Sequence, residues 1–289
     1  MPRASSPEPA PISPALLRDW RIGTGDRGTV LVIGGARTVP GAPALSGTAA
    51  LRAGAGTLQL AVADRHATAI GVSVPESLVT GLPETTSGAI APDAVDRLAD
   101  VLPGAGTVVV GPGRTGAAET EDLLRRLVPA IAPDANVLLD AFALGALSRA
   151  PELAEPLAGR LLLTPNRVEA AFLDGCEEED VDDLETAVRI AGRYGGVVQL
   201  MGVVAEPGGR TWRDGSGHVG LATSGSGDVL AGLTGGFLAR GARAEQAACW
   251  ATHVHAVAGQ RLIPDTGSTG LLARELVAEI PRVIAELER

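Results

Sequence analysis

A glycine-rich turn, ATSGSGDVLAG at residues 222–232, places one acid directly before an apolar helical pattern. Glycines let several backbone N–H groups point at one anion, and the first turn of a helix leaves such groups unpaired at its positive end. The backbone of Gly225, Ser226 and Gly227 is therefore expected to form an anion hole for a phosphate. Because the Asp228 carboxylate would repel that phosphate, we assign it as the general base that deprotonates an attacking hydroxyl.

A purely structural role is the alternative for this aspartate. Aspartate is a favoured N-cap residue, and glycine-rich turns before helices are common. The turn lacks the lysine of a Walker motif and the glycine spacing of a dinucleotide fingerprint. The turn alone therefore leaves both roles of Asp228 open.

Short Val/Leu-rich runs alternate with helical patterns and must position this turn. Strands are expected near residues 28–35, 56–63, 106–113, 136–142, 160–166 and 196–207. Unbroken apolar strands predict a mainly parallel sheet with helices on both faces, and ligands of such sheets bind at the carboxyl ends of the strands. The helical region from 229 to 262 is expected to break near Gly235 and Gly241.

The composition excludes several classes of function. A formal net charge of −10 and a pI near 4.9 argue against nucleic acid or an anionic membrane as the main partner. Cys176 and Cys249 have no metal-type spacing, and no apolar run is long enough to span a bilayer. We expect a cytoplasmic protein with residues 1–20 as a disordered or extended leader and residues 21–289 as a single domain.

Two smaller groups of polar residues are expected to be structural. His253 and His255 lie two positions apart on a predicted helix, so they point in different directions and cannot both bind one metal ion well. We expect His255 to be a packing residue. The acidic run at residues 176–185 is expected to form a solvated loop and a helix start, because acids suit helix N-termini.

Ordered motifs from about residue 25 to 285 resemble those of one family. The matching segments are PGAPALSGTAALRAGAGTLQLAV, SVPESLV, VVVGPGRTG, LLDAFAL, LLTPNRVEAAFL, GLATSGSGDVLAG, HAVAGQRL and GLLARELVAEIP. On these motifs the chain resembles the ADP/ATP-dependent NAD(P)H-hydrate dehydratases. These belong to the ribokinase-like superfamily, whose members carry a GxGD anion hole with a catalytic aspartate.

This resemblance implies a ribokinase-like three-layer α/β/α fold with a central, mainly parallel sheet. It implies that hydrated NADH or NADPH is the substrate, that ADP or ATP is the co-substrate, and that Mg²⁺ assists. The hydroxyl of the hydrate would accept the terminal phosphoryl group and then leave as phosphate, which restores the reduced cofactor. A homotetramer is also implied.

The resemblance assigns further site residues by position. The hydrate would contact Ala42, Gly111, Gly113, Asn166 and Asp228. The nucleotide would contact Met201, Gly202, Val203, Val204, Ala205 and Gly227. Glu169 completes an N-x-x-E spacing that would hold Mg²⁺ through water, and carboxylates suit that hard cation.

Departures from the family pattern cluster at the binding edge. Met201 stands where the family's nucleotide segment has lysine, and Phe142 replaces the second aspartate of its DADAL segment. Arg114, which stands where the family has leucine, is a hypothetical replacement for the lost lysine charge. Two other functions therefore stay open. One is a ribokinase-like kinase of another small alcohol, and the other is a catalytically lapsed paralogue that binds nucleotide.

Overall fold

The computed structural model describes residues 8–25 and 27–289 and contains one ten-stranded sheet. The strands are β1 (Ala10–Pro11), β2 (Thr29–Ile33), β3 (Thr57–Ala63), β4 (Ser77–Leu82), β5 (Thr107–Val110), β6 (Asn136–Leu139), β7 (Leu161–Leu163), β8 (Val197–Leu200), β9 (Val203–Ala205) and β10 (Thr211–Arg213). Their order across the sheet is β1-β10-β9-β8-β7-β6-β5-β2-β3-β4. Neighbouring strands from β8 to β4 are parallel, whereas β9 runs antiparallel to both of its neighbours.

Helices connect the strands and cover the sheet. The α-helices are α1 (Pro14–Asp19), α2 (Ala42–Ala53), α3 (Asp64–Ser73), α4 (Ala117–Leu127), α5 (Phe142–Arg149), α6 (Arg167–Asp174), α7 (Asp183–Tyr194), α8 (Ser226–Ala239), α9 (Ala244–Thr266) and α10 (Ala273–Leu287). Short 3-10 helices span Pro92–Leu98, Leu102–Gly104, Val128–Ala130, Pro151–Leu157, Glu178–Asp180 and Val219–Leu221.

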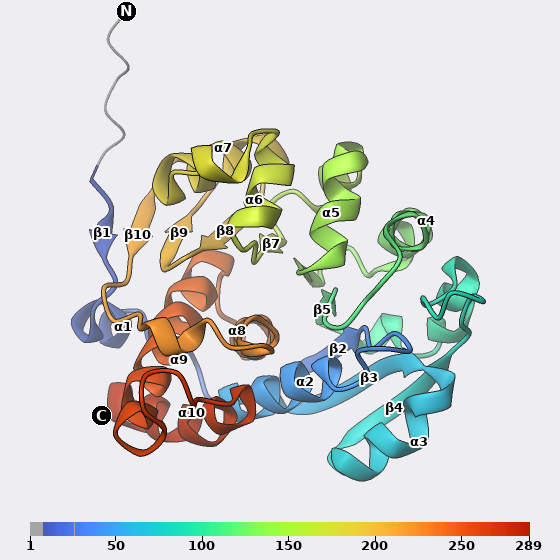
Figure 1. The fold of residues 1–289 in the computed structure, drawn as a ribbon, viewed down its shortest axis with the longest axis horizontal. Coiled ribbons are helices and arrows are strands. Elements are labelled where there is room, and N and C mark those ends of the chain that lie inside the picture. Colours follow the sequence, from blue (N-terminus) through green and yellow to red (C-terminus); the bar gives the residue numbers. More distant parts are fainter. Residues whose placement is uncertain (1–7, 26) are drawn as a thin grey trace, which may run out of the picture.

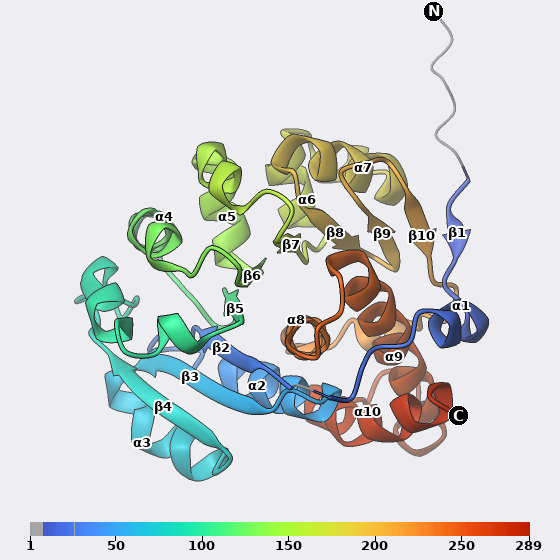
Figure 2. The ribbon, with the colours of Figure 1, turned by 180° about the vertical axis from the view of Figure 1, so that it is seen from behind.

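Two helical layers enclose the sheet. Helices α4 to α7 pack on one face, while α2, α3 and α8 to α10 pack on the other, each layer with its own hydrophobic cluster (Figures 1 and 2). Strands β5 and β6 lie in the middle of the sheet and are covered from both sides, and the side chains of residues 137–139 are almost completely buried. This arrangement confirms the predicted three-layer α/β/α fold with a mainly parallel sheet.

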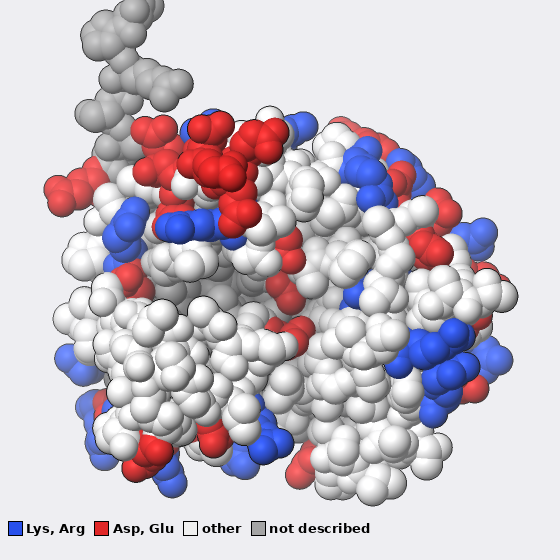
Figure 3. Space-filling view, viewed as in Figure 1, with Lys and Arg blue, Asp and Glu red and all other residues white. Residues whose placement is uncertain are grey.

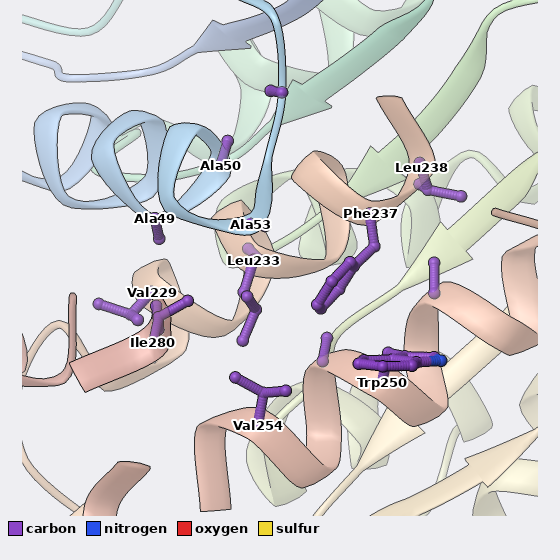
Figure 4. Packing of buried hydrophobic residues seen from close by; sticks show 14 of the residues in the cluster. Ala49, Ala50, Ala53, Val229, Leu233, Phe237, Leu238, Trp250, Val254 and Ile280 are labelled. Carbon is purple, nitrogen blue, oxygen red and sulfur yellow. The ribbon is translucent and has the colours of Figure 1, made fainter. Parts of the chain in front are cut away.

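Glycines in α8 permit unusually close packing rather than breaking the helix. A Cβ added to Gly232 would lie 1.9 Å from the carbonyl oxygen of Ser46, and one added to Gly236 would lie 2.4 Å from that of Ala50. Helices α8 and α2 are therefore almost in backbone contact, as the packing view shows (Figure 4). The predicted break near Gly235 is wrong, because this glycine lets α8 pack against Val109 of β5. The break near Gly241 is observed.

The N-terminal segment differs from its expectation. Residues 1–7 lie outside the described residues, but residues 10–11 pair with β10 and residues 14–19 form α1. The Ser13 side chain caps α1 by accepting from the Leu16 amide, and Pro14 suits the first helical position. Leu17 is fully buried, and Trp20 packs edge-on against Trp212 with ring centroids 5.5 Å apart. Apolar contacts therefore order residues 10–20. The extended strand β1 is one of the two expected forms, whereas the helix α1 is neither disordered nor extended.

The acidic run has the role expected for it. Residues Glu178–Asp180 form an exposed 3-10 turn, and the Asp182 side chain caps α7 by accepting from the amides of Leu184 and Glu185. Within the described part of the chain, we find no helix with both the length and the apolar character required to cross a membrane.

Candidate active site

The glycine-rich turn forms the start of α8, in the middle of the molecule. Gly225 is the N-cap and adopts a left-handed conformation with φ of 86°, which an L-residue with a side chain rarely adopts. Asp228 lies at the third helical position rather than at the cap, and no side chain caps this helix. A Cβ added to Gly225 would lie 3.9 Å from Oδ2 of Asp228, so the carboxylate lies directly beside the turn. The ordinary capping role therefore does not apply to Asp228.

Backbone amides of the turn differ in their availability to a ligand. The Ser226 amide donates to the Thr223 carbonyl oxygen at 3.2 Å, and the Val229 amide donates to that of Gly225 at 3.1 Å. Among the described residues, the amides of Gly225 and Gly227 have no backbone acceptor. The geometry thus leaves the Gly225 and Gly227 amides for an anion, whereas the Ser226 amide is already engaged.

His255 of α9 contacts the turn through Ser226. Its Nε2 lies 3.0 Å from Oγ and 3.1 Å from the carbonyl oxygen of Ser226, and the Ser226 side chain is buried. Burial lowers the pKa of His255 to about 4, so the imidazole is neutral at neutral pH and adds no charge beneath the turn. His255 was expected to be a packing residue, and the structure shows that it packs against Ser226.

Three carboxylates converge on this position from three elements. Asp140 follows β6, Glu169 lies in the first turn of α6, and Asp228 lies in the first turn of α8. Burial and the neighbouring Glu169 raise the pKa of Asp228 to about 6. Burial, followed by the charges of Glu169 and Asp228, raises the pKa of Asp140 well above its usual range. A carboxyl group with a pKa close to neutral suits a general base.

Asp140 was not predicted as a site residue, although its position at a strand end is a signal for one. It is 6% exposed, and its Oδ1 accepts a hydrogen bond of 2.8 Å from Oγ1 of Thr164. The next residue, Ala141, has φ of 50° and ψ of −127°, a strained backbone for a residue with a Cβ, at a cost of about 1–3 kcal/mol. Gly111 fits against the Asp140 carbonyl oxygen, which an added Cβ would approach to 1.9 Å.

The N-x-x-E segment is also a helix-capping device. Oδ1 of Asn166 accepts from the Glu169 amide at 2.9 Å, and the Asn166 amide donates to Oε2 of Glu169 at 2.9 Å. This capping box explains the N-x-x-E spacing without a ligand and fixes both side chains at the start of α6. Burial raises the pKa of Glu169, although the hydrogen bond from the Asn166 amide opposes that rise.

The residues expected to contact the hydrate come together on neighbouring loops. Gly113, with φ of 67°, approaches both the Val39 carbonyl oxygen and the Ala42 side chain. Ala42 is only 4% exposed and Gly111 is buried, whereas Gly113 is half-buried and Asn166 is exposed. Gly113 and Asn166 are therefore open to solvent, while Ala42 and Gly111 mainly shape the loops behind them.

The expected nucleotide segment forms the hairpin turn between β8 and β9. Met201 and Gly202 are the two turn residues, with φ of 47° and 84°, and Met201 is 59% exposed. The side chains of the next three residues are buried in the sheet. A nucleotide lying over this turn would meet the Met201 and Gly202 surface, and it would meet Val203, Val204 and Ala205 only through their main chain.

Arg114 does not replace the missing lysine at this turn. It follows β5, and strands β6 and β7 separate β5 from β8, a distance of about 14 Å at the usual strand spacing. Its side chain is 2% exposed and turns toward Thr120 of α4. The hypothesis of charge replacement by Arg114 is therefore wrong.

The acids of the site suit a cation held indirectly. No group of three histidine, cysteine, aspartate or glutamate residues in the described parts of the chain is close enough to coordinate one metal ion directly. The charge of Glu169 nevertheless raises the pKa of both Asp140 and Asp228, and the charge of Asp228 raises that of Asp140, which signals excess negative charge in one place. Mg²⁺ suits such a site when waters and phosphate oxygens supply most of its ligands.

The space-filling view shows a hollow in the face that carries the loops at the carboxyl ends of the strands (Figure 3). Acidic side chains line part of this hollow, while its lower wall is largely uncharged. An anionic nucleotide entering there would meet these acids, and its charge could be offset by backbone amides, by a cation and by the basic side chains at the upper rim of the hollow (Figure 3).

Comparisons with known proteins identify close relatives. Residues 30–282 match the family model described as NAD(P)H-hydrate dehydratase. The chain is 42% identical, over 91% of its length and 90% of the other protein, to an ADP-dependent (S)-NAD(P)H-hydrate dehydratase of Xanthomonas campestris pv. campestris. It is 35% identical over 90% of its length to a bifunctional NAD(P)H-hydrate repair enzyme of Moorella thermoacetica, but it spans only 50% of that protein.

Solved structures agree with the fold. A ribokinase-like superfamily protein of Enterococcus faecalis superposes with a TM-score of 0.83 at 21% identity, over 97% of both chains. An ADP/ATP-dependent NAD(P)H-hydrate dehydratase of Bacillus subtilis, co-crystallised with ATP and Mg²⁺, gives a TM-score of 0.80 at 24% identity over 98% of this chain and 100% of that one.

Proposed function

Because the chain belongs to the NAD(P)H-hydrate dehydratase family, we propose that it uses a nucleotide to dehydrate hydrated NADH or NADPH. The chain is then a hydro-lyase that repairs a damaged cofactor. Family membership supports this function over a kinase for another small alcohol and over a lapsed nucleotide-binding paralogue. The observation that carries the proposal is the position of Asp228, beside available backbone amides and two further acids at the start of α8.

In the first step Asp228 accepts the proton of the hydrate's hydroxyl group. The hydroxyl oxygen forms a bond to the terminal phosphorus of the nucleotide, and the bridging P–O bond breaks. The amides of Gly225 and Gly227 stabilise the negative charge on the transferred phosphoryl group. Mg²⁺, when bound beside Glu169, would supply positive charge to the phosphate oxygens and orient them.

In the second step the phosphorylated hydroxyl leaves as phosphate. Hydroxide is a poor leaving group, so the phosphoryl transfer is what makes this departure possible. The lone pair of the ring nitrogen assists as the C–O bond breaks, and loss of a proton from the adjacent ring carbon restores the C=C bond. With ADP, the products are AMP, phosphate and the reduced cofactor.

Several finer features belong to this proposal. We assign ADP as the preferred nucleotide because the 42% identical relative is named ADP-dependent. Hydrate contacts are assigned to the loops around Gly113 and Asn166, and nucleotide contacts to Met201, Gly202 and Gly227. Mg²⁺ as the metal, a homotetramer, a cytoplasmic location and a single domain over residues 21–289 follow from the resemblance and the composition.

A direct assay tests the function. The purified protein is incubated with NADH hydrate or NADPH hydrate, Mg²⁺ and either ADP or ATP, and dihydronicotinamide absorbance and released phosphate are followed together. We expect both signals to rise in equal amounts. Nucleotide consumption with accumulation of a phosphorylated product would instead indicate the kinase, and the absence of any turnover would indicate the lapsed paralogue.

A further inference from the structure

Arg114 is a buried arginine whose two terminal nitrogens have no hydrogen-bond partner among the described residues. It is 2% exposed, and only its Nε donates a hydrogen bond, to Oγ1 of Thr120 at 3.3 Å. Burial lowers the pKa of Arg114 to about 10, so the guanidinium group still carries its charge at neutral pH. Buried charges in proteins are normally paired, because an unpaired one has lost its hydration without compensation.

The loop that carries Arg114 forms a wall of the candidate active site. It runs from Gly111 to Gly116, between β5 and α4, and its glycines at 111, 113 and 116 all have positive φ. Gly111 packs on the Asp140 main chain, and Gly113 packs on Ala42. Arg114 therefore directly follows the part of the loop that we assign to hydrate binding.

The guanidinium group also contacts the first turn of α4. This helix begins after Gly116, no side chain caps it, and Thr120 lies in its first turn. In the described structure, the amides of Ala117 and Ala118 have no backbone acceptor. The helix dipole and the Arg114 charge thus both favour an anion at this helix start.

One acid lies near this positive charge. The Glu119 carboxylate acts on Arg114 through its charge, but the two side chains form no hydrogen bond. Glu119 instead accepts a long hydrogen bond of 3.5 Å from Oγ of Ser87. The terminal nitrogens of Arg114 therefore remain unpaired among the residues that the structure describes, and a phosphate would reach these buried atoms only after the side chain turns outward.

We propose that Arg114, together with the first turn of α4, binds a phosphate group of the dinucleotide substrate. This proposal rests on the proposed function, which supplies the substrate. Hydrated NADH carries a pyrophosphate, and hydrated NADPH carries an additional 2′-phosphate. The planar guanidinium fits two phosphate oxygens at once. Its side chain has several rotatable bonds, so it can turn outward while giving up only the hydrogen bond to Thr120.

The test measures binding of the stable products NADH and NADPH by isothermal titration calorimetry. The variants are R114L, R114K and, as a matched control on exposed α4 surface, R126L. We expect R114L to weaken binding by about tenfold or more, because a charged hydrogen-bonded contact is lost, and R114K to weaken it less. An equal loss for both dinucleotides identifies the pyrophosphate as the bound group, and a loss confined to NADPH identifies the 2′-phosphate.

The proposal is overturned if R114L weakens the binding of neither dinucleotide by about tenfold. If R114L does not fold, competition with the parent protein replaces it. The proposal is then overturned if inorganic pyrophosphate does not displace NADH and if neither pyrophosphate nor 2′-AMP displaces NADPH. Calorimetric binding does not depend on turnover. If the protein binds NADPH through Arg114 but never dehydrates the hydrate, the proposed function is overturned and this inference stands. If R114L is active and its binding is unchanged, this inference is overturned and the proposed function stands.

Discussion

Two turns of the molecule are expected to contact the nucleotide, and they are built differently. The turn before α8 is held by buried contacts: His255 supports Ser226, and α8 packs almost backbone to backbone on α2. The turn between β8 and β9 is exposed, and Met201 there occupies the position at which the family pattern has lysine. The turn that carries the proposed chemistry is therefore the more constrained of the two.

A buried hydrogen-bond network joins α8, β8 and α9, the elements next to the two turns. Thr234 of α8 donates to Oε1 of Gln199 in β8 at 2.9 Å, and Nε2 of Gln199 donates to Oγ1 of Thr252 in α9 at 3.0 Å. Near the hairpin, the Asp214 amide donates to the Gly202 carbonyl oxygen, and Nδ1 of His253 lies 2.6 Å from Oδ2 of Asp214. The main chain of the hairpin is thus anchored, so the lost lysine removes a charge without loosening the hairpin.

This difference predicts that changes at the α8 turn affect the reaction rate, whereas changes at the hairpin affect nucleotide affinity. Substitutions at the two turns and in the α8 scaffold test that division.

Replacing Asp228 by asparagine should give the largest effect. The amide cannot accept the hydroxyl proton, so kcat for hydrate dehydration should fall by about 10³-fold while the protein stays folded. Steady-state assays with saturating ADP measure this loss, and Asp122→Asn on the exposed surface of α4 is the matched control. If D228N retains kcat within about threefold of the parent, Asp228 is not the base.

Substituting Gly232 by alanine should destabilise the α8 scaffold. The new Cβ would lie 1.9 Å from the Ser46 carbonyl oxygen, so α2 and α8 must separate, and unfolding free energy should fall by about 3 kcal/mol. Urea denaturation measures the change. Gly192→Ala in α7, where an added Cβ meets nothing within 4 Å, should be neutral or stabilising by up to about 1 kcal/mol. Equal stability of the two variants would show that the close packing does not constrain α8.

Restoring lysine at Met201 should give the smallest effect. The exposed side chain would place a positive charge beside the nucleotide phosphates, so KM for ADP should fall by about fivefold with little change in kcat. Val72→Lys, a change at an exposed position of α3 (78% against 59% for Met201), controls for the added charge. A change in kcat instead of KM would contradict the division between the two turns.

The sequence predicted the central strands and their layer architecture because buried parallel strands are continuously apolar. It did not predict β10 or its pairing with β1, since two- and three-residue edge strands carry no periodic signal. Residues 94–102 have a helical pattern, but the structure forms two short 3-10 segments there, with Pro92 and Pro103 at their starts. Glycines in α8 were interpreted as breaks, although only the packed structure shows their close contacts.

The site was predictable where it depends on a local motif. The motif indicated Gly225 and Asp228 because the glycine-rich turn, the acid and the start of the helix are adjacent in the sequence. The approach of Asp140 and Glu169 to Asp228 joins β6, α6 and α8, so it depends on tertiary packing that no local pattern encodes. The burial of Arg114 beneath α4 is equally non-local, which is why its assignment to the nucleotide was wrong.

The pH dependence of kcat/KM for the hydrate, at saturating ADP, tests the central role of Asp228 most directly. Burial and Glu169 raise the pKa of Asp228 to about 6, and a base must be deprotonated to act. We predict that kcat/KM rises about tenfold per pH unit below pH 6 and levels off above it. A rate that is unchanged between about pH 5 and 7, or that falls as pH rises through 6, would contradict the account.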